Sequence, residues 1–287
     1  MATSTMHSGL IATEQVEPSP AFLRFSDIPT MFLFGVRVDN LDEPDALQTI
    51  RGYLSRQSTG PARQVFFTNV HSIHLALRDR TLLRTVNRAD LALPDGSGLS
   101  IAGRVLGHPV RANLNGTDLI PKLLRHAEAE GWTVYLFGAQ TGVLDRCRER
   151  LAAQFPRLQI VGCHHGYCSP EEEQTLLDEI NATQPDLLLV ALGSPRQETW
   201  IARHAPSLNV RVCCAVGGLF DFVSGARKRA PRWMRRFGIE WAFRFLIDPK
   251  AKWDRFFIEI PLFLALVLAT RVAPGWAHLL MPRKVRR

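Results

Sequence analysis

The sequence predicts an α/β fold, with a mostly parallel sheet, helices on both faces and a C-terminal helical appendage. Short apolar runs alternate with longer amphipathic stretches, which is typical of strand–helix–strand units. Most of the short runs are apolar at nearly every position, as are parallel strands buried on both faces. From about residue 226 the strand-like runs stop and the chain becomes rich in Arg, Trp and Phe, which indicates a separate helical segment.

Seven apolar runs are the expected strands of a right-handed, Rossmann-like sheet. They are MFLFGVRV (31–38), QVFFTNV (64–70), ADLALPD (89–95), WTVYLFGA (132–139), LQIVGC (158–163), DLLLVALG (186–193) and VRVCCAVGG (210–218). Helix start signals precede the stretches between them: Asp42 before 43–57, Thr117 before 118–130, and Ser169 with Pro170 before 171–183. Ligands of such folds bind at the carboxyl ends of the strands, so the loops there are the candidate site.

Composition divides the 287 residues into three parts. Residues 1–25 are rich in small polar residues and proline and lack the basic-then-apolar order of a secretory signal, so we expect a flexible N-terminal segment. Residues 26–225 are the expected α/β domain, and residues 226–287 are the appendage. The five cysteines form no CxxC pair, which favours a reduced, cytoplasmic compartment.

The positive charge of the chain is concentrated at its C-terminal end. Residues 226–287 hold 15 of the 35 Lys and Arg but only 4 of the 27 Asp and Glu, giving +11 there and −3 elsewhere. No nucleic-acid-reading module accompanies this charge; instead, an apolar run over 256–269 falls short of the ~20 residues that span a bilayer. A short apolar helix with basic flanks suits an anionic membrane surface. The alternative is a helix packed on the core, and the sequence leaves open which describes residues 256–270.

Asp95 is the candidate catalytic carboxylate. It follows an expected strand and precedes Gly96 and Gly98, which allow the backbone to approach a ligand closely. A carboxylate at that edge could take a proton from a hydroxyl nucleophile. The alternative is that Asp95 only caps the helix that begins near Ser97.

The segment VALGSPRQE is the candidate nucleotide-binding turn. It ends a strand in Gly193 and begins a helix whose first amide N–H groups would face an anion, with Arg196 as a fixed positive charge. Gln197 and Glu198 could contact a ribose or a base. The alternative is an ordinary strand-to-helix turn with Pro195 at the first helical position. Neither GxGxxG nor GxxxxGK[ST] occurs, so a dinucleotide fingerprint and a P-loop are unsupported.

No metal or other cofactor is expected. The sequence has no DxD pair with which to clamp a diphosphate through a divalent ion, and the basic residues after 226 could neutralise a diphosphate instead. His71 and His74 lack a third ligand in sequence range, so His74 is expected to pack and His71 to lie near substrate. His164 and His165 carry no clear signal. The other candidate binding residues end further strands or begin helices, namely Asn115, Gly116, Thr117, Asp118, Gly138, Gly217, Gly218 and Asp221.

Seven motifs, in order, resemble those of a known family. They are TNVHS, ADLALPDGSG, NGTDL, YLFGA, LGSPRQETWI, VGGLFDFVSGARKRAPRWM and GIEWAFRFLIDP. Together they resemble the WecG/TagA/CpsF glycosyltransferases, glycosyltransferase family 26, from about residue 32 to residue 255. The chain departs from the family pattern by continuing into FFIEIPLFLALVLATRV and a basic tail at 283–287.

The resemblance implies a metal-independent, inverting enzyme. The family transfers glucose, N-acetylmannosamine or its uronic acid from a UDP-sugar to a polyprenyl-diphosphate-linked saccharide in bacterial exopolysaccharide or cell-surface glycan synthesis. It works peripherally on the cytoplasmic face of the cell membrane. The resemblance leaves the donor sugar, the acceptor and a possible homo-oligomer open.

The resemblance also implies roles for particular residues. It makes Asp95 the general base, with Thr68 and Asn69 lining the same pocket. The PRQE-like segment is implied to contact the nucleotide, although many members have lysine where this chain has Arg196. Three arginines are candidates for stabilising the diphosphate from the appendage: Arg232, Arg244 and Arg255.

Two alternative functions come from other classes. A UDP-sugar epimerase or dehydrogenase would suit the alternation of strands and helices, but the glycine fingerprint and a Tyr-x-x-x-Lys pair are missing. A non-catalytic, membrane-peripheral protein of polysaccharide assembly would suit the basic appendage. Turnover of a UDP-sugar with a lipid-linked acceptor distinguishes both from the glycosyltransferase.

Overall fold

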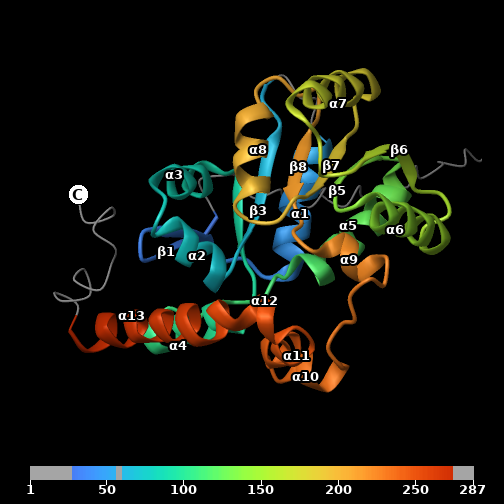
Figure 1. Cartoon of the computed structure of the whole chain (residues 1–287). Helices are drawn as coiled ribbons and strands as arrows, with labels where there is room; N and C mark the ends of the chain where they lie inside the picture. The colour runs from blue at the N-terminus through green and yellow to red at the C-terminus, as the bar shows by residue number, and fades with distance from the viewer. Residues whose placement is uncertain (1–27, 56–59, 274–287) are drawn as a thin grey trace, which may run out of the picture.

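A computed structural model describes residues 28–55 and 60–273 of the chain (Figure 1). The flexible segment expected over 1–25 and the basic tail at 283–287 lie outside the described residues. The expected Rossmann-like α/β fold with a C-terminal helical region is confirmed. Its centre is a six-stranded parallel sheet in the order β4-β3-β8-β7-β5-β6. The strands are β3 (Arg63–Thr68), β4 (Leu91–Pro94), β5 (Thr133–Gly138), β6 (Gln159–His164), β7 (Leu187–Ala191) and β8 (Val212–Ala215).

The prediction of one strand over 31–38 is wrong. This run is a separate antiparallel hairpin of β1 (Thr30–Leu33) and β2 (Val36–Asp39). Phe34 and Gly35 form its two-residue turn with φ of 54° and 82°, the geometry that reverses a hairpin. An unbroken apolar run hides such a reversal. The hairpin supports β4, because Asp39 accepts a 2.7 Å hydrogen bond from the backbone N–H of Ala92.

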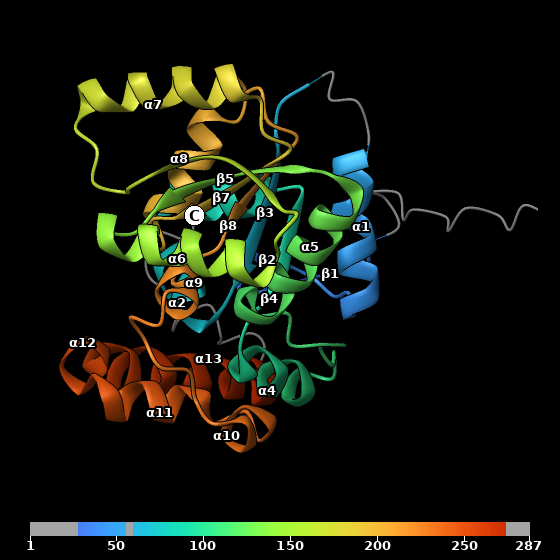
Figure 2. The same ribbon diagram turned by 90° about the vertical axis from the view of Figure 1, so that its right-hand side faces the viewer.

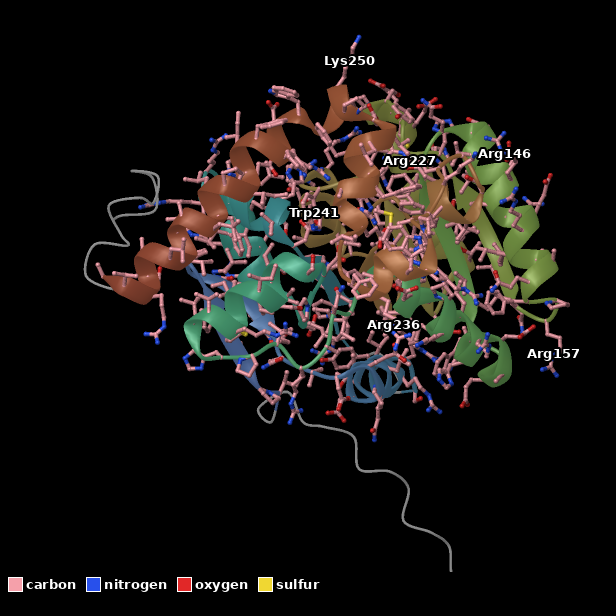
Figure 3. All side chains as sticks on the ribbon, turned by 90° about the horizontal axis from the view of Figure 1, so that it is seen from below. Arg146, Arg157, Arg227, Arg236, Trp241 and Lys250 are labelled. Atoms are coloured by element: carbon pink, nitrogen blue, oxygen red, sulfur yellow. The ribbon has the colours of Figure 1, made fainter. Side chains whose placement is uncertain are left out.

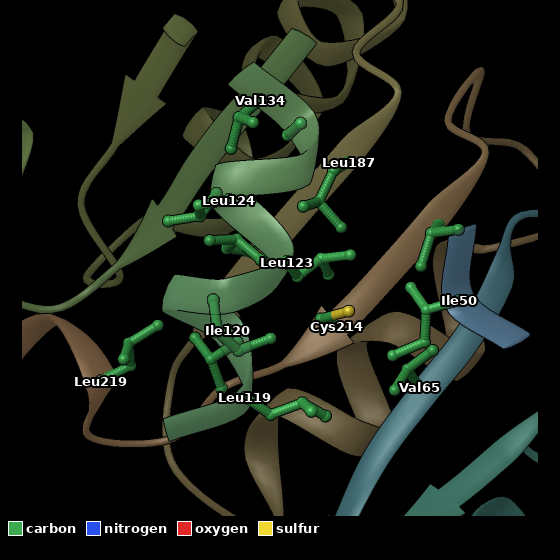
Figure 4. Packing of buried hydrophobic residues seen from close by; sticks show 14 of the residues in the cluster. Ile50, Val65, Leu119, Ile120, Leu123, Leu124, Val134, Leu187, Cys214 and Leu219 are labelled. Atoms are coloured by element: carbon green, nitrogen blue, oxygen red, sulfur yellow. The ribbon is translucent and has the colours of Figure 1, made fainter. Parts of the chain in front are cut away.

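Helices cover both faces of the sheet. Alternate residues of a strand belong to two different buried clusters. Leu187 and Leu189 lie in one cluster, and Leu188 and Val190 lie in the other. The first cluster packs under α1, α5, α6 and α9, and Figure 4 shows α5 laid on the strands there. The second packs under α2, α3, α4, α7 and α8. The bounds are α1 (Glu43–Ser55), α2 (Val70–Ala76), α3 (Arg80–Arg88), α4 (Ser97–Leu106), α5 (Gly116–Glu130), α6 (Thr141–Gln154), α7 (Pro170–Thr183), α8 (Arg196–His204) and α9 (Leu219–Val223).

The helix start signals are confirmed in two cases and wrong in one. The Asp42 carboxylate accepts from the N–H of Asp45, and Ser169 forms a full capping box at α7. The cap of α5 is Asn115 instead of Thr117, because its side chain accepts from the N–H of Asp118 at 3.0 Å. The Thr117 hydroxyl donates to Asn115 Oδ1 instead.

The appendage is a helical layer beneath the sheet. Figures 1 and 2 both show it on the side where α2, α4 and α9 begin, which is the side of the carboxyl ends of the strands. It consists of α10 (Arg232–Arg236), α11 (Glu240–Ile247), α12 (Pro249–Asp254), the π-helical turn η2 (Arg255–Glu259) and α13 (Ile260–Val272).

Helix α13 packs on the α/β domain with one face only. Phe263 and Leu266 belong to the second buried cluster, and the Phe263 ring makes an edge contact with Phe34. Leu264 and Leu268 on the other face are exposed. Within the described ranges, no helix combines the length and the apolar composition needed to cross a bilayer.

Candidate functional site

Asp95 lies at the carboxyl end of β4, beside the end of β3. Its backbone N–H donates to the carbonyl of Thr68 at 2.7 Å, and its Oδ2 accepts from Asn69 Nδ2 at 3.2 Å. Helix α4 begins at Ser97 with Gly96 as its cap residue and no side-chain capping bond. Asp95 is therefore not the cap of α4, and its carboxylate faces the edge of the sheet.

The loop that carries Asp95 is fixed on both sides. Gly96 has a φ of 94°, a conformation that glycine adopts without strain, and its N–H donates to Asn113 Oδ1 at 2.6 Å. The Ser97 hydroxyl donates to the carbonyl of Gly238 at 2.7 Å, which ties the loop to the appendage. Sequence reasoning missed Asn113 and Gly238, because nothing in their local pattern indicates a partner this far along the chain.

Asn69 is held by the helix that follows it. Its Oδ1 caps α2 by accepting from the N–H of Ser72, and the Ser72 hydroxyl completes the capping box. The amide nitrogen of Asn69 is thereby left to face Asp95. Thr68 is buried, and its hydroxyl has no hydrogen-bond partner within the described part of the chain. The structure thus brings Thr68, Asn69 and Asp95 together, in the arrangement that the resemblance implied.

Burial raises the pKa of Asp95 above its usual range. The positive charges of Arg244 and Arg229 and the hydrogen bond from Asn69 oppose that rise, while the carboxylate of Glu240 adds to it. A raised pKa makes this carboxylate a stronger base than a free aspartate, and the nearby cations favour its ionised form.

Asn115, Thr117 and Asp118 join the start of α5 to the appendage. Asp118 receives a bidentate pair of hydrogen bonds from Arg229, at 2.6 and 2.8 Å. Arg229 also donates to Asn115 Oδ1 at 3.3 Å. Burial raises the pKa of Asp118, but the hydrogen bonds from Arg229 and Asn115 have the larger combined effect. The pKa of Asp118 is therefore lowered. Arg229 was not singled out from the sequence, since its spacing resembles that of the basic residues around it.

The three predicted diphosphate arginines are placed differently. Arg244 lies over the Phe222 ring at 5.2 Å and pairs with Glu240. Burial lowers the pKa of Arg255, and the positive charges of Arg244 and Arg227 lower it further, so these three cations are neighbours. Arg232 is exposed on α10. Figure 3 shows this side of the molecule, with Arg227 beside the appendage ribbon.

Three glycines mark the edge of the sheet beyond β3. Gly217 after β8, Gly193 after β7 and Gly138 at the end of β5 have φ of 54°, 75° and 130°. A Cβ on Gly138 would lie 2.4 Å from the carbonyl oxygen of Ala191, so a larger residue cannot fit there. These turns leave backbone groups at the edge that a ligand can approach.

The Arg196, Gln197 and Glu198 side chains do not point the same way. Arg196 is exposed, whereas Gln197 and Glu198 are buried. Gln197 accepts from the N–H of Gly217 at 2.9 Å and donates to Glu198 at 3.0 Å, so it supports the next turn along the edge. Burial raises the pKa of Glu198. The nearby Ser194 hydroxyl favours the charged form of Glu198. Among the described residues, Glu198 Oε2 has no hydrogen-bond partner.

The remaining predicted residues lie around α9 and α5. Gly218 precedes α9, and Asp221 within it lies 3.5 Å from Arg227. Gly116 is the first residue of α5 and packs near the Phe67 ring. All therefore lie at the carboxyl end of the sheet.

A histidine connects this region to the appendage. His71 Nδ1 lies 2.8 Å from a carboxylate oxygen of Glu259, which is buried in η2. His74 is buried, as expected for a packing role, and burial lowers its pKa. Glu259 was missed from the sequence because it interrupts an apolar run with no visible partner.

Within the described residues, one group of three or more potential metal-ligating His, Cys, Asp or Glu side chains lies close together, formed by His164, His165 and Cys168. It lies at the end of β6, at the opposite edge of the sheet from β4.

Comparison with known proteins gives a consistent result. The family model described as the glycosyl transferase WecG/TagA/CpsF family matches residues 31–276. A protein of Bacillus spizizenii named N-acetylglucosaminyldiphosphoundecaprenol N-acetyl-beta-D-mannosaminyltransferase is 35% identical over 193 residues, covering 67% of this chain and 74% of that protein. A protein of the same name from Staphylococcus aureus is 30% identical over 234 residues, covering 81% of this chain and 89% of that protein. The chain therefore belongs to the WecG/TagA/CpsF family of glycosyltransferases.

Proposed function

We propose that the chain transfers a hexose or N-acetylhexosamine from a UDP-sugar to a polyprenyl-diphosphate-linked saccharide, with inversion and without a metal. The names of the two relatives support a lipid-linked acceptor. N-acetylmannosamine as the donor sugar and N-acetylglucosaminyl-diphosphoundecaprenol as the acceptor are accordingly the first pair to test, ahead of glucose and the uronic acid of N-acetylmannosamine.

The main support for this proposal is the carboxylate of Asp95. Asn69 orients it, and Arg244 and Arg229 lie near it. Asp95 takes the proton of the acceptor hydroxyl as the hydroxyl oxygen attacks the anomeric carbon. UDP leaves from the opposite face, which inverts that carbon. Cations already in place offset the negative charge that builds on the departing diphosphate, with no reorganisation at the moment of reaction.

The glycine turns support a place for the donor nucleotide. From β4 to β5 the sheet has four strand intervals, which at about 4.8 Å each give an edge of roughly 19 Å. An edge of that length accommodates a sugar and its nucleotide side by side. We place the nucleotide toward Gly193 and Gly138, with Arg196 as the exposed cation beside it and the transferred sugar toward Asp95.

The surface of the appendage supports a peripheral position on a membrane, whose cytoplasmic face is the one that we propose. Among the residues that the structure describes, 15 large apolar side chains are exposed, and 11 of them lie between residues 233 and 272. Basic residues accompany them, and Figure 3 shows Trp241 and Lys250 on this segment. Apolar side chains that enter the headgroup region and cations that attract anionic lipid would hold the site against its lipid-linked acceptor.

Substitution of Asp95→Asn tests the proposal. We expect UDP to bind with unchanged affinity in calorimetry, while transfer to a synthetic lipid-linked N-acetylglucosamine falls by at least about 100-fold, the scale of a lost general base. The matched control is Asp79→Asn, which makes the same exchange at the cap of α3, where asparagine caps equally well. Undiminished transfer by Asp95→Asn would refute the assignment.

A further inference from the structure

Two histidines and a cysteine converge at the end of β6, at the edge of the sheet opposite Asp95. His164 ends the strand, and His165 and Cys168 follow in the loop. One potential ligand atom from each residue lies within 4.8 Å of the other two. All three residues are half-buried, so they are sheltered but open to an ion from solvent.

The separation of one pair of ligand atoms matches a tetrahedral ion. Cys168 Sγ lies 3.4 Å from His164 Nδ1. A sulfur at about 2.3 Å and a nitrogen at about 2.0–2.1 Å from one tetrahedral zinc are roughly 3.5 Å apart. The carbonyl oxygen of His165 lies 2.8 Å from the same Nδ1 and 3.3 Å from Sγ, so it accepts hydrogen bonds from these groups when no ion is bound. An ion would release the thiol proton to solvent on binding.

The loop also makes contacts that do not involve these three side chains. The N–H of Gly166 donates to the carbonyl of Ala139 at 2.9 Å. A Cβ on Gly166 would lie 2.6 Å from the Leu192 side chain and 3.1 Å from Gly138 Cα, so the loop packs against the ends of β5 and β7. Arg196 reaches toward the Gly166 carbonyl at 3.5 Å. The cluster therefore stands next to the glycine turns, one strand beyond them.

Charged groups of both signs lie near Cys168, namely the carboxylates of Glu172 and Glu173 and the guanidinium of Arg196. Glu173 is already engaged, since its Oε1 accepts from Trp200 Nε1 at 2.8 Å and lies 3.5 Å from His204. Three protein ligands are then available, and a fourth position is left for water.

We propose that His164, His165 and Cys168 bind one divalent ion, with Zn²⁺ as the physiological choice. Imidazole and thiolate ligands select zinc over the magnesium or calcium that oxygen ligands prefer. Because the cluster is at the far edge of the sheet from Asp95, the ion has no part in the transfer chemistry. It would fix the loop that backs Gly138 and Arg196. The inference does not depend on the proposed function, because metal binding is measured without turnover.

The test uses the full chain, stripped of metal with a chelator. Titration with Co²⁺, a spectroscopic substitute for zinc, should give a thiolate-to-cobalt charge-transfer band, and elemental analysis after gel filtration should find one Zn²⁺ per chain. Cys168→Ser and His165→Asn should abolish the band or weaken Zn²⁺ binding by more than about tenfold. Cys163→Ser, a thiol on β6 just before the cluster, is the matched control and should behave as the wild type.

Circular dichroism checks that each variant is folded. If Cys168→Ser does not fold, the zinc binding of His165→Asn provides the test. Two results would overturn the proposal. One is a wild-type chain that gives no thiolate band and retains no zinc. The other is a folded variant that binds zinc as tightly as the wild type, because that would assign the ion to other residues.

Discussion

The α/β domain buries most of its apolar side chains, whereas the appendage leaves many of its own exposed. The domain encloses its apolar residues in two clusters, one on each face of the sheet. The appendage buries Met234, Phe263 and a few neighbours but leaves Phe237, Leu246 and Val272 more than 70% exposed. A soluble surface rarely carries such a concentration of apolar area without a binding purpose. The domain is thus built for packing and the appendage for contact with something else.

Charges of opposite sign from the same two regions lie close together around Asp95. The domain provides the Asp95 carboxylate, and the appendage provides Arg244 and Arg229, which favour its ionised form. Polar contacts connect them: Ser97 with Gly238, Asp118 with Arg229, and His71 with Glu259. We infer that the site is complete only when the appendage is docked.

After Asp95→Asn itself, the largest expected effect comes from Asn69→Asp, a change inside the domain. The new carboxylate keeps the oxygen that caps α2 but removes the donor to Asp95 and places a like charge beside it. The apparent pKa of the pair rises, so less of the base is ionised at neutral pH. Loss of a hydrogen bond to a charged group costs about 1.5–3 kcal/mol, so kcat/KM should fall about ten- to a hundredfold at pH 7. An unchanged Tm would show that the cap survives, and unchanged kcat/KM would exclude a role for Asn69.

The next effect concerns the exposed face of the appendage. Leu246→Ser with Ile247→Ser removes two exposed apolar side chains, and we expect at least about tenfold weaker partitioning onto anionic vesicles, since a buried aliphatic side chain contributes about 1.5–3 kcal/mol. Added salt should weaken wild-type binding as well, because it screens the basic residues.

Val161→Ser is the control for that experiment. It removes an apolar side chain that is 37% exposed on β6, outside the appendage. Its vesicle binding should equal that of the wild type. Equal binding by all three proteins would contradict a membrane role for this face.

A smaller effect is expected from Asp118→Asn, which breaks the link between α5 and Arg229. Both side chains are partly exposed, at 42% and 25%, so solvent screens the pair and the loss should be about 1 kcal/mol, or roughly 2–4 °C in Tm. Because the pKa of Asp118 is lowered in the folded chain, this stabilisation is present above its unfolded pKa and is lost as pH falls through the folded value. Thermal unfolding at neutral and acid pH measures it, and a pH-independent difference would contradict the ion-pair explanation.

Most of the sheet could be predicted from the sequence, because buried parallel strands leave continuous apolar runs. The hairpin at 31–38 could not, since the reversal at Phe34 and Gly35 lies within such a run. The cap of α5 was misplaced by two residues because Asn115, Thr117 and Asp118 all suit a helix start. Family membership makes the chain a glycosyltransferase, which sets aside the epimerase or dehydrogenase and the non-catalytic assembly protein.

The site was predictable only where its residues follow strands. Thr68, Asn69 and Asp95 end neighbouring strands, so the topology alone brings them together. Arg229 and Glu259 reach the site from the appendage, and their partners depend on how that segment folds back. Arg232, Arg244 and Arg255 have similar sequence surroundings, yet the structure exposes Arg232, half-buries Arg255 and places Arg244 where it acts on Asp95.

The central claim is that a cation of the appendage lowers the pKa of Asp95 in the domain. The pH dependence of kcat/KM for Arg244→Gln tests this claim most directly. The cation lowers the pKa of Asp95, so its removal, which also frees the carboxylate of Glu240, raises that pKa. The acidic limb of the profile should therefore move to higher pH. Arg232→Gln, an equal loss of charge on exposed α10, should leave the limb in place. A limb unmoved in Arg244→Gln, or moved equally in both variants, would contradict the account.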